Sequence, residues 1–310
     1  MDRTTDQLPS ALAGFGNRLA EIFGIQRANR VLDSMRRPKV FGYWVNPLRS
    51  GSPLPESSPL PEIDGYWTAP DGLRQDILRG DAAINGQIYP INPSSLLAVA
   101  VLAPQAGEEV LDLAAAPGGK TIVAAAAMAN QGRIAVVEPV KGRFHRMRAN
   151  LARCGVEIAE GYLRDGRGVG SKVPDRFDAV LLDAPCSSEA RIRLDEPQTY
   201  AHWKPRKIRE VARKQRALLA SAYRAVKPGG RVVYCTCSFA PEENELVVQQ
   251  LLSAQPDAIV ADLHLSGPSM VSGIETWRGK DLRRDVAAAV RVVPDGLWDG
   301  FFLCRIEKPV

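Results

Sequence analysis

The sequence has few cysteines, few histidines and no long apolar run. Five cysteines, irregularly spaced along 310 residues, exclude a secreted domain held together by disulfides. Three histidines, with no Cys-x-x-Cys pair, argue against a zinc site. No stretch approaches the roughly 20 apolar residues of a membrane span, and the N-terminus, with Asp2 and Asp6, lacks a secretory signal. We therefore expect a cytoplasmic protein with no membrane span and no metal.

No extreme of composition or charge dominates the chain. It is 45% hydrophobic and 24% charged, which is average for a folded protein and excludes disorder as the main state. Forty Lys and Arg against 35 Asp and Glu give a net charge of +5, which fits a polyanionic partner such as nucleic acid without requiring one.

The first 85 residues differ in pattern from the rest. Apolar residues recur there at helical spacings and predict one or two helices over 8–35: Leu12, Phe15, Leu19, Ile22 and Phe23. Six prolines lie between positions 47 and 70, and the proline-rich stretch "SGSPLPESSPLPE" (50–62) cannot form a regular helix or a central strand. We interpret residues 1–85 as a small N-terminal α/β extension and residues 86–310 as the main domain.

In the main domain, short apolar runs alternate with helical stretches. This pattern predicts βαβ units and a Rossmann-like, doubly wound, mostly parallel α/β sheet. The candidate strands are 109–114, 133–138, 157–163, 177–183, 230–236 and a late edge strand over 300–307.

A glycine-containing loop, "LDLAAAPGGKT" (111–121), follows the first of these strands and opens a helix. Gly118 and Gly119 let the backbone approach a ligand, whose polar groups can meet the NH groups of the helix N-terminus. The loop lacks the G-x-G-x-x-G fingerprint, which disfavours a dinucleotide site. It has Ala114 where a phosphate-binding loop has its first glycine, which argues against an ATPase.

Acidic residues follow the next two strands. Glu138, at the end of the second strand, is placed to accept hydrogen bonds from both ribose hydroxyls of an adenosine ligand. Asp165, after the third strand, could bind the adenine amino group. For each acid the alternative is a solvated loop residue or a helix cap.

Two thiols stand at further strand ends, in "DAPCSS" (183–188) and "YCTCSF" (234–239). The carboxyl ends of strands in an α/β sheet open onto one crevice, so Cys186 and Cys237 are expected to converge beside the adenosine pocket. Cys154, Cys235 and Cys304 are expected to be buried apolar residues.

With these motifs the chain resembles the RNA 5-methylcytosine methyltransferases of the RsmB and Sun type. The resemblance covers most of the chain from residue 86, including "GQIYPINPSSLLAV" (86–99), "FDAVLLDAPCSSEARIR" (177–193) and "KPGGRVVYCTCSFAPEENE" (227–245). It implies S-adenosylmethionine as cofactor, Cys237 as the nucleophile that forms a covalent cytosine adduct, and Cys186 as the group that helps to release the product. The implied cofactor residues are Ala114, Ala115, Ala116, Pro117, Gly118, Gly119, Lys120, Glu138, Arg143, Asp165 and Asp183.

The chain departs from the family pattern at three places. Ala115 stands where many members have Cys, Glu138 where many have Asp, and Ser-Ser-Glu-Ala (187–190) replaces a glycine-rich run. These departures leave the thiols in place and put only the shape of the target pocket in doubt.

Asp183 and Lys120 are further candidates for the catalytic group. Asp183 can hydrogen-bond the amino group and ring nitrogen of a flipped cytosine, or it can cap the strand end. Lys120 can orient the cofactor or Asp183, or it can be a surface charge.

The substrate expected from the resemblance is ribosomal or transfer RNA. Seven Lys or Arg between Trp203 and Arg216 would contact phosphates. Tyr200, His202 and Trp203 could stack on unpaired bases, with core packing an equal alternative for Trp203. A catalytically inactive, cofactor-binding RNA assembly factor is the alternative function, and a monomer is the simplest expectation.

Overall fold

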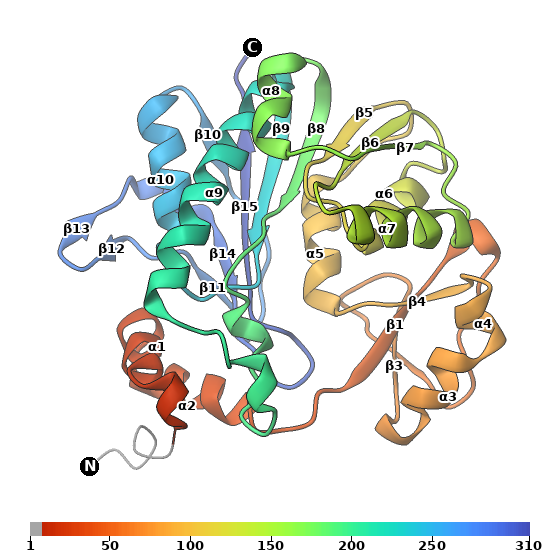
Figure 1. Cartoon of the computed structure of the whole chain (residues 1–310), viewed down its shortest axis with the longest axis horizontal. Coiled ribbons are helices and arrows are strands. Elements are labelled where there is room, and N and C mark those ends of the chain that lie inside the picture. The colour runs from red at the N-terminus through yellow and green to blue at the C-terminus, as the bar shows by residue number, and fades with distance from the viewer. Residues whose placement is uncertain (1–7) are drawn as a thin grey trace. The chain divides into compact units, whose positions relative to one another are not determined.

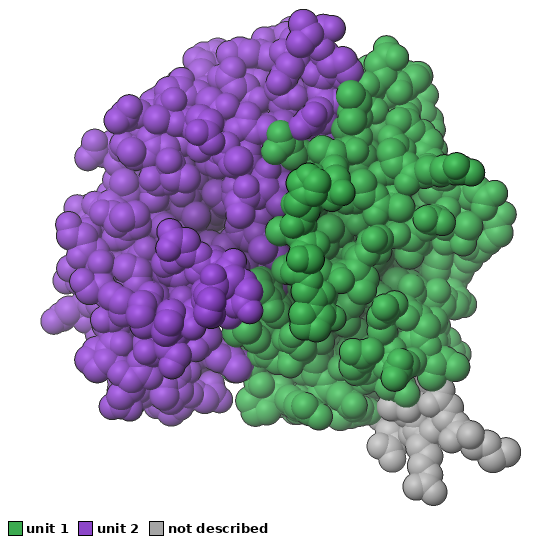
Figure 2. All heavy atoms as spheres, turned by 180° about the vertical axis from the view of Figure 1, so that it is seen from behind, with its two compact units in different colours: residues 1–39, 184–219, 235–305 green, residues 40–183, 220–234, 306–310 purple. Residues whose placement is uncertain are grey.

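The structure, a computed structural model, describes residues 8–310, so Asp2 and Asp6 lie outside the described residues. The chain divides into two compact units, coloured separately in Figure 2. Unit 1 comprises residues 1–39, 184–219 and 235–305, and unit 2 comprises residues 40–183, 220–234 and 306–310. This division does not follow the boundary expected at residue 85, because residues 40–85 group with the parallel strands and 8–39 with the segments that carry the two thiols.

Unit 2 contains the parallel strands expected from the sequence. Their order is β8-β5-β6-β7, with β9 (Val226–Thr236) next to β8. The four are β5 (Glu109–Asp112), β6 (Arg133–Val137), β7 (Ala159–Tyr162) and β8 (Phe177–Asp183). The register pairs Val110 with Ile134 and with Ala179, all in parallel. The expected strands are confirmed, with ends that differ by up to two residues except at the start of β9, which lies four residues before the predicted one.

Helices connect these strands, as crossover connections of a parallel sheet require. Between β5 and β8 they are α6 (Gly119–Ala127), α7 (Lys141–Arg153), η4 (Gly166–Gly168) and α8 (Val169–Lys172), while α5 (Pro93–Leu102) precedes β5. Figure 1 labels these α-helices. Asn92 starts α5, since its side chain accepts a hydrogen bond from the Ser94 NH and Pro93 fixes the first helical φ. The mixed α/β, Rossmann-like fold class is confirmed.

A small antiparallel sheet, in the order β2-β3-β1-β4, completes unit 2. Its elements are β1 (Phe41–Val45), η2 (Pro47–Arg49), β2 (Ser58–Pro59), β3 (Tyr66–Ala69), η3 (Asp71–Leu73), α3 (Arg74–Arg79), α4 (Asp81–Ile84) and β4 (Ile88–Pro90). The proline-rich stretch contributes only the two-residue edge strand β2, as its prolines require. Buried Asn46 donates to the carbonyls of Gly86 and Cys154, which ties this sheet to the parallel strands.

Unit 1 begins with the expected N-terminal helices, η1 (Ser10–Leu12), α1 (Phe15–Phe23) and α2 (Ile25–Ser34). Its further helices are η5 (Glu189–Arg191), η6 (Pro197–Thr199), α9 (Pro205–Ala225), which continues into unit 2, α10 (Glu245–Ala254) and η7 (Arg284–Ala288).

The strands of unit 1 correct one expectation. They are β10 (Ile259–Ala261), β11 (Met270–Ser272), the hairpin β12 (Thr276–Trp277) and β13 (Lys280–Asp281), β14 (Val290–Val292), and β15 (Phe301–Glu307). The prediction that residues 300–307 form an edge strand is wrong, because β15 has β14 on one side and β9 on the other. The three-residue strands β11 and β14 are too short to stand out in the sequence.

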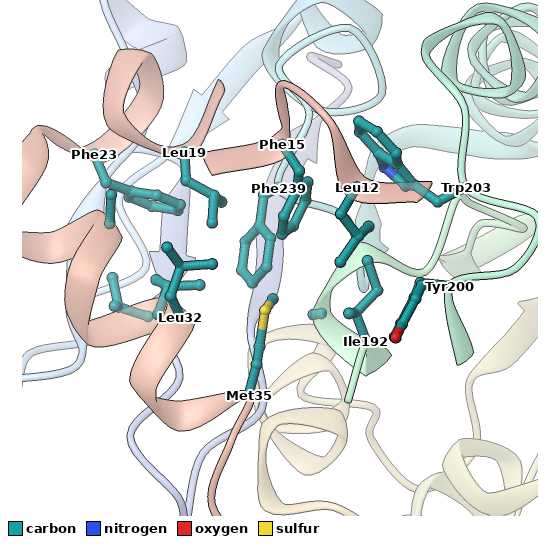
Figure 3. Close-up of a cluster of buried hydrophobic side chains, with 14 residues drawn as sticks. Leu12, Phe15, Leu19, Phe23, Leu32, Met35, Ile192, Tyr200, Trp203 and Phe239 are labelled. Carbon is teal, nitrogen blue, oxygen red and sulfur yellow. The ribbon is translucent and has the colours of Figure 1, made fainter. Parts of the chain in front are cut away.

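A cluster of large apolar side chains forms the core between the N-terminal helices and the segments that follow Cys186 and Cys237 (Figure 3). Phe15 packs edge-on against Trp203, and Phe23 against Phe239, with ring centroids 5.2 and 5.6 Å apart. Tyr200 and Trp203 are only 6% and 8% exposed, so the prediction that Tyr200 stacks on RNA bases is wrong, and for Trp203 the alternative of core packing is confirmed. Their apolar surfaces are used in the core instead.

Candidate active site

The loop "LAAAPGG" between β5 and α6 lies in unit 2. Gly118 has φ +104°, a conformation that favours glycine. A Cβ on Gly119 would lie 2.9 Å from the Tyr89 ring, so the close packing of Tyr89 already requires a glycine there. Gly119 is therefore needed for packing, whether or not the backbone of the loop also approaches a ligand there.

Asp112, at the end of β5, was missed by the sequence analysis. It is 3% exposed, and its Oδ2 accepts a hydrogen bond of 2.7 Å from the Thr121 hydroxyl. Its Oδ1 is buried without a hydrogen-bond partner among the described residues. Burial raises the pKa of Asp112 to about 6, against the opposing effect of the Thr121 hydrogen bond. The only signal in the sequence was its place at a strand end before the glycine loop.

Lys120 and Asp183 form an ion pair in unit 2. The Lys120 Nζ lies 2.6 Å from Asp183 Oδ2, and the Lys120 side chain is 11% exposed. This burial argues against Lys120 as a surface charge. The ion pair favours the alternative that Lys120 orients Asp183.

Glu138 lies at the end of β6 and is 1% exposed. Its Oε1 accepts a hydrogen bond from the Val140 NH, and its Oε2 lies 3.4 Å from Arg143. Arg143 also donates to the Ala116 carbonyl, 2.9 Å away, and so links Glu138 to the glycine loop.

Asp165 is half exposed and caps η4, because its Oδ1 accepts from the Arg167 NH. Its Oδ2 is paired with the Arg167 side chain at 2.6 Å. The capping alternative thus describes Asp165, whereas Glu138 is buried and the N-cap residue of α7 is Val140.

These carboxylates can be tested for their fit to a nucleoside cofactor. Asp112, Glu138, Asp165 and Asp183 end or follow the parallel strands β5, β6, β7 and β8, at the edge where α/β sheets bind ligands. The partnerless Oδ1 of Asp112 is an acceptor that a donor on a ligand can satisfy. Ribose hydroxyls, an adenine amino group and an ammonium group are such donors, so this set of residues fits an S-adenosyl group.

The two thiols lie together in unit 1. The sulfur atoms of Cys186 and Cys237 are 3.1 Å apart, well beyond the roughly 2.05 Å of a disulfide bond. The Ser188 hydroxyl lies 3.6 Å from Cys237 Sγ and 3.9 Å from Cys186 Sγ. The prediction that these two cysteines converge is confirmed, and so is the burial of Cys154, Cys235 and Cys304, each 0% exposed.

Positive charge near Cys237 comes from a residue that the sequence analysis did not consider. The pKa of Lys39 is lowered to about 8, chiefly by burial and also by the charges of Arg193 and Arg191, while its interaction with Cys237 acts to raise it. Lys39 also pairs with Asp299. A cation within electrostatic range of Cys237 favours the thiolate form of that cysteine.

The basic run of α9 is exposed, as a phosphate-contacting surface requires. Lys204, at the end of the preceding loop, and the residues Arg206, Lys207, Arg209, Arg213 and Lys214 of the helix are exposed, and Arg216 is partly buried. Arg206 pairs with Glu210. Among residues 8–310, no group of three or more His, Cys, Asp or Glu could hold a metal ion, and no helix is long and apolar enough to cross a bilayer.

Comparisons with known proteins place the chain in a family. Residues 99–307 match the family described as 16S rRNA methyltransferase RsmB/F. Ribosomal RNA small subunit methyltransferase F of Cronobacter sakazakii is 37% identical over 252 residues, which are 79% of this chain and 50% of that protein. The chain therefore spans about half the length of the curated relatives that it matches.

Solved structures agree with this assignment. A methyltransferase homolog protein from Pyrococcus horikoshii has a TM-score of 0.80 at 28% identity, and the match covers 97% of this chain and 99% of that one. NSun6 from Pyrococcus horikoshii, solved with SFG, has the same fold, with a TM-score of 0.79 at 20% identity over 97% of this chain and 98% of that one. With the glycine loop and the paired thiols in place, the chain belongs to the 16S rRNA methyltransferase RsmB/F family.

Proposed function

We propose that this protein methylates carbon 5 of a cytosine in ribosomal RNA, with S-adenosylmethionine as methyl donor. The observation that carries the proposal is the 3.1 Å separation of the Cys186 and Cys237 sulfurs, each on a segment that follows a strand. The names of the relatives, ribosomal RNA small subunit methyltransferases, favour ribosomal over transfer RNA as the substrate.

The chemistry requires a nucleophile from the enzyme because carbon 5 of cytosine is too poor a nucleophile to take a methyl group from a sulfonium unaided. The Cys237 thiolate adds to carbon 6, forming an S–C bond and making carbon 5 enamine-like. Carbon 5 then takes the methyl group, and the S–CH₃ bond of the donor breaks. Lys39 supports the first step, because its charge stabilises the thiolate.

S-adenosylmethionine, when bound, supplies a methyl group on a positively charged sulfur. The residues proposed to hold it are Glu138 for the ribose, Asp165 for the adenine amino group, and Asp112 for a donor that reaches its buried Oδ1. Arg143 fixes the glycine loop relative to Glu138, because it donates to the Ala116 carbonyl and pairs with the Glu138 carboxylate.

Asp183 and Lys120 are proposed to act on the cytosine as a pair. Asp183 accepts hydrogen bonds from the amino group and stabilises the ring as charge develops on it. The ion pair of 2.6 Å keeps the Asp183 carboxylate oriented for this role.

Release of the product reverses the addition. The proton on carbon 5 leaves to a base, the electron pair of that C–H bond forms the carbon 5–carbon 6 double bond, and the Cys237 thiolate departs. Cys186, in sulfur contact with Cys237, is the residue proposed to assist this elimination.

RNA is proposed to bind along the exposed basic face of α9, where Arg and Lys contact phosphates independently of the base sequence. Residues 1–85 are proposed as an RNA-binding extension. The monomeric state and the cytoplasmic location stay predictions from the sequence.

The test is a denaturing gel of the Cys186→Ala protein purified from growing cells. If Cys186 is needed for release, an RNA adduct accumulates, and it disappears in the Cys186→Ala, Cys237→Ala double variant. Sequencing the attached RNA identifies the cytosine. Absence of an adduct, together with a wild-type protein that binds S-adenosylmethionine and methylates no cellular RNA, would refute the proposal in favour of an inactive assembly factor.

A further inference from the structure

The buried carboxylate of Glu243 bonds both turns that carry the thiols, beside direct links between the turns: the Ser187 and Ser238 hydroxyls lie 3.0 Å apart, and the Ala190 NH donates to the Cys237 carbonyl at 3.0 Å. Each cysteine is followed by a serine, Ser187 after Cys186 and Ser238 after Cys237. The Ser187 backbone NH donates to Glu243 Oε2 at 2.9 Å, and the Ser238 hydroxyl donates to Glu243 Oε1 at 3.0 Å. Oε2 of Glu243 therefore bonds the Cys186 turn, and Oε1 bonds the Cys237 turn.

Glu243 is itself held rigidly. It is 0% exposed, in the segment just before α10. Gln215, from α9, donates to Glu243 Oε2 at 2.9 Å and also to the carbonyl of Pro185, the residue before Cys186. The Cys186 turn is thus held on both sides of the cysteine.

The neighbouring residue Asn244 holds the Cys237 turn in the same way. Its Oδ1 accepts from the Thr236 hydroxyl at 2.6 Å, and its Nδ2 donates to the Ser238 carbonyl at 2.8 Å. Thr236 and Ser238 flank Cys237, so both sides of the nucleophile are fixed to the segment 243–244. No bond of this set involves a sulfur atom, so the set acts on the position of the thiols through the backbone.

We propose that Glu243 is a positioning residue that sets the separation of Cys186 and Cys237 by bonding the residue that follows each of them. The catalytic consequence rests on the proposed function, because the two thiols must act on the same cytosine in succession. The geometric part does not depend on that function, since it concerns the thiol pair alone.

The hydrogen bonds allow this role in both protonation states of Glu243. As a carboxylate it accepts from all three donors. When protonated on Oε1 it donates to the Ser238 hydroxyl, whose own hydrogen then reaches Glu189 Oε2, 3.3 Å away. A glutamine at 243 can copy this second arrangement, with its oxygen toward Ser187 and its NH₂ toward Ser238, whereas an alanine keeps neither bond.

The test uses phenylarsine oxide, which captures two neighbouring thiols. The arsenic forms two As–S bonds, and the two thiol protons leave with its oxygen as water. The rate of capture on the intact protein is followed by mass spectrometry, with Cys186→Ala as the zero reference. Cys154, Cys235 and Cys304 are fully buried and do not compete.

We expect capture to be about tenfold slower in Glu243→Ala, the effect of losing hydrogen bonds to a buried group. Glu243→Gln should stay within about threefold of wild type. Ser238→Ala, which removes the bond to Glu243 on the Cys237 side together with the contact to the Ser187 hydroxyl, should be slowed. Glu242→Ala is the matched control, because the Glu242 carboxylate bonds Arg18. In methylation assays, Glu243→Ala should lower kcat with the KM for RNA unchanged.

Wild-type capture rates in Glu243→Ala, or equally slow capture in Glu243→Gln and Glu243→Ala, would overturn the proposal. If Glu243→Ala does not fold, Ser238→Ala decides, and an unchanged rate there overturns it. A wild-type protein that captures phenylarsine oxide but methylates no RNA refutes the proposed function alone. A protein that methylates RNA with capture rates insensitive to residue 243 refutes the positioning role alone.

Discussion

The buried carboxylate of Glu243 makes the stability of the fold depend on pH. Burial raises its pKa from 4.5 to about 7, with the nearby Glu189 adding to the rise and the hydrogen bonds from Ser187 and Gln215 opposing it. The folded state therefore binds this proton more tightly than the unfolded state does. The resulting stabilisation is fully present below pH 4.5, falls as the pH rises, and is lost above pH 7.

The size of the effect follows from the shift. A difference of about 2.5 units corresponds to about 3 kcal/mol in all, of which about 2 to 3 kcal/mol is lost between pH 5 and pH 8. Glu243→Gln cannot titrate at this position and keeps the hydrogen bonds. Between pH 5 and pH 8 its free energy of unfolding should therefore fall by about 2 to 3 kcal/mol less than that of the wild type. For a chain of this length the difference corresponds to about 4 °C in Tm.

Urea unfolding followed by tryptophan fluorescence at pH 5, 6, 7 and 8 measures this difference. Trp203, packed in the same unit as Glu243, reports the transition. Glu242→Gln controls for the introduction of a glutamine at the adjacent position. Equal changes of the free energy of unfolding with pH in the wild type and in Glu243→Gln would refute the reasoning.

Three further changes have defined outcomes. Ser188→Gly should raise the free energy of unfolding by about 1 kcal/mol in urea titrations, because Ser188 has φ +59°; a loss of stability would contradict this. Arg291→Met should lower it by about 3 to 5 kcal/mol, since Arg291 and Glu245 are 2% and 0% exposed and the variant leaves a buried charge alone; a loss below about 1 kcal/mol in the same titration would argue against a buried pair. Arg209→Ala and Arg213→Ala should each reduce the slope of log affinity for RNA against log salt by about 1, measured by filter binding between 50 and 200 mM salt; unchanged slopes would place the RNA elsewhere.

The sequence predicted those features that have a local pattern. The strands β5, β6 and β8 are apolar runs bounded by polar residues, and the glycine loop has a fixed order of residues. Cys186 and Cys237 could be brought together because each follows a strand of a parallel-type sheet. Such features depend on neighbours in the sequence.

Other features depend on residues far apart in the chain and left no such pattern. The position of β15 inside its sheet depends on β14, whose Val-Arg-Val is indistinguishable from loop sequence. Tyr200 looked like an exposed aromatic residue beside a basic run, and the sequence left base stacking and core packing equally open for Trp203. The packing of the N-terminal helices buries both. Glu189 and Glu243 are glutamates in a charged sequence, and burial of such residues is too rare to expect without the fold.

The way unit 1 is assembled has a consequence for the order of events during synthesis. Its first segment ends at Lys39 and its second begins at Ala184, so the ribosome adds about 145 residues before α1 and α2 can find their packing partners. At 5–20 residues per second, this interval lasts roughly 7 to 30 seconds. During that time the apolar faces of Phe15, Leu19 and Phe23 have no native partner from that segment, and a chaperone that shields them would raise the yield of active protein. The thiols of Cys186 and Cys237, whose turns are bonded to residue 243, reach their final separation only after most of the chain has been made.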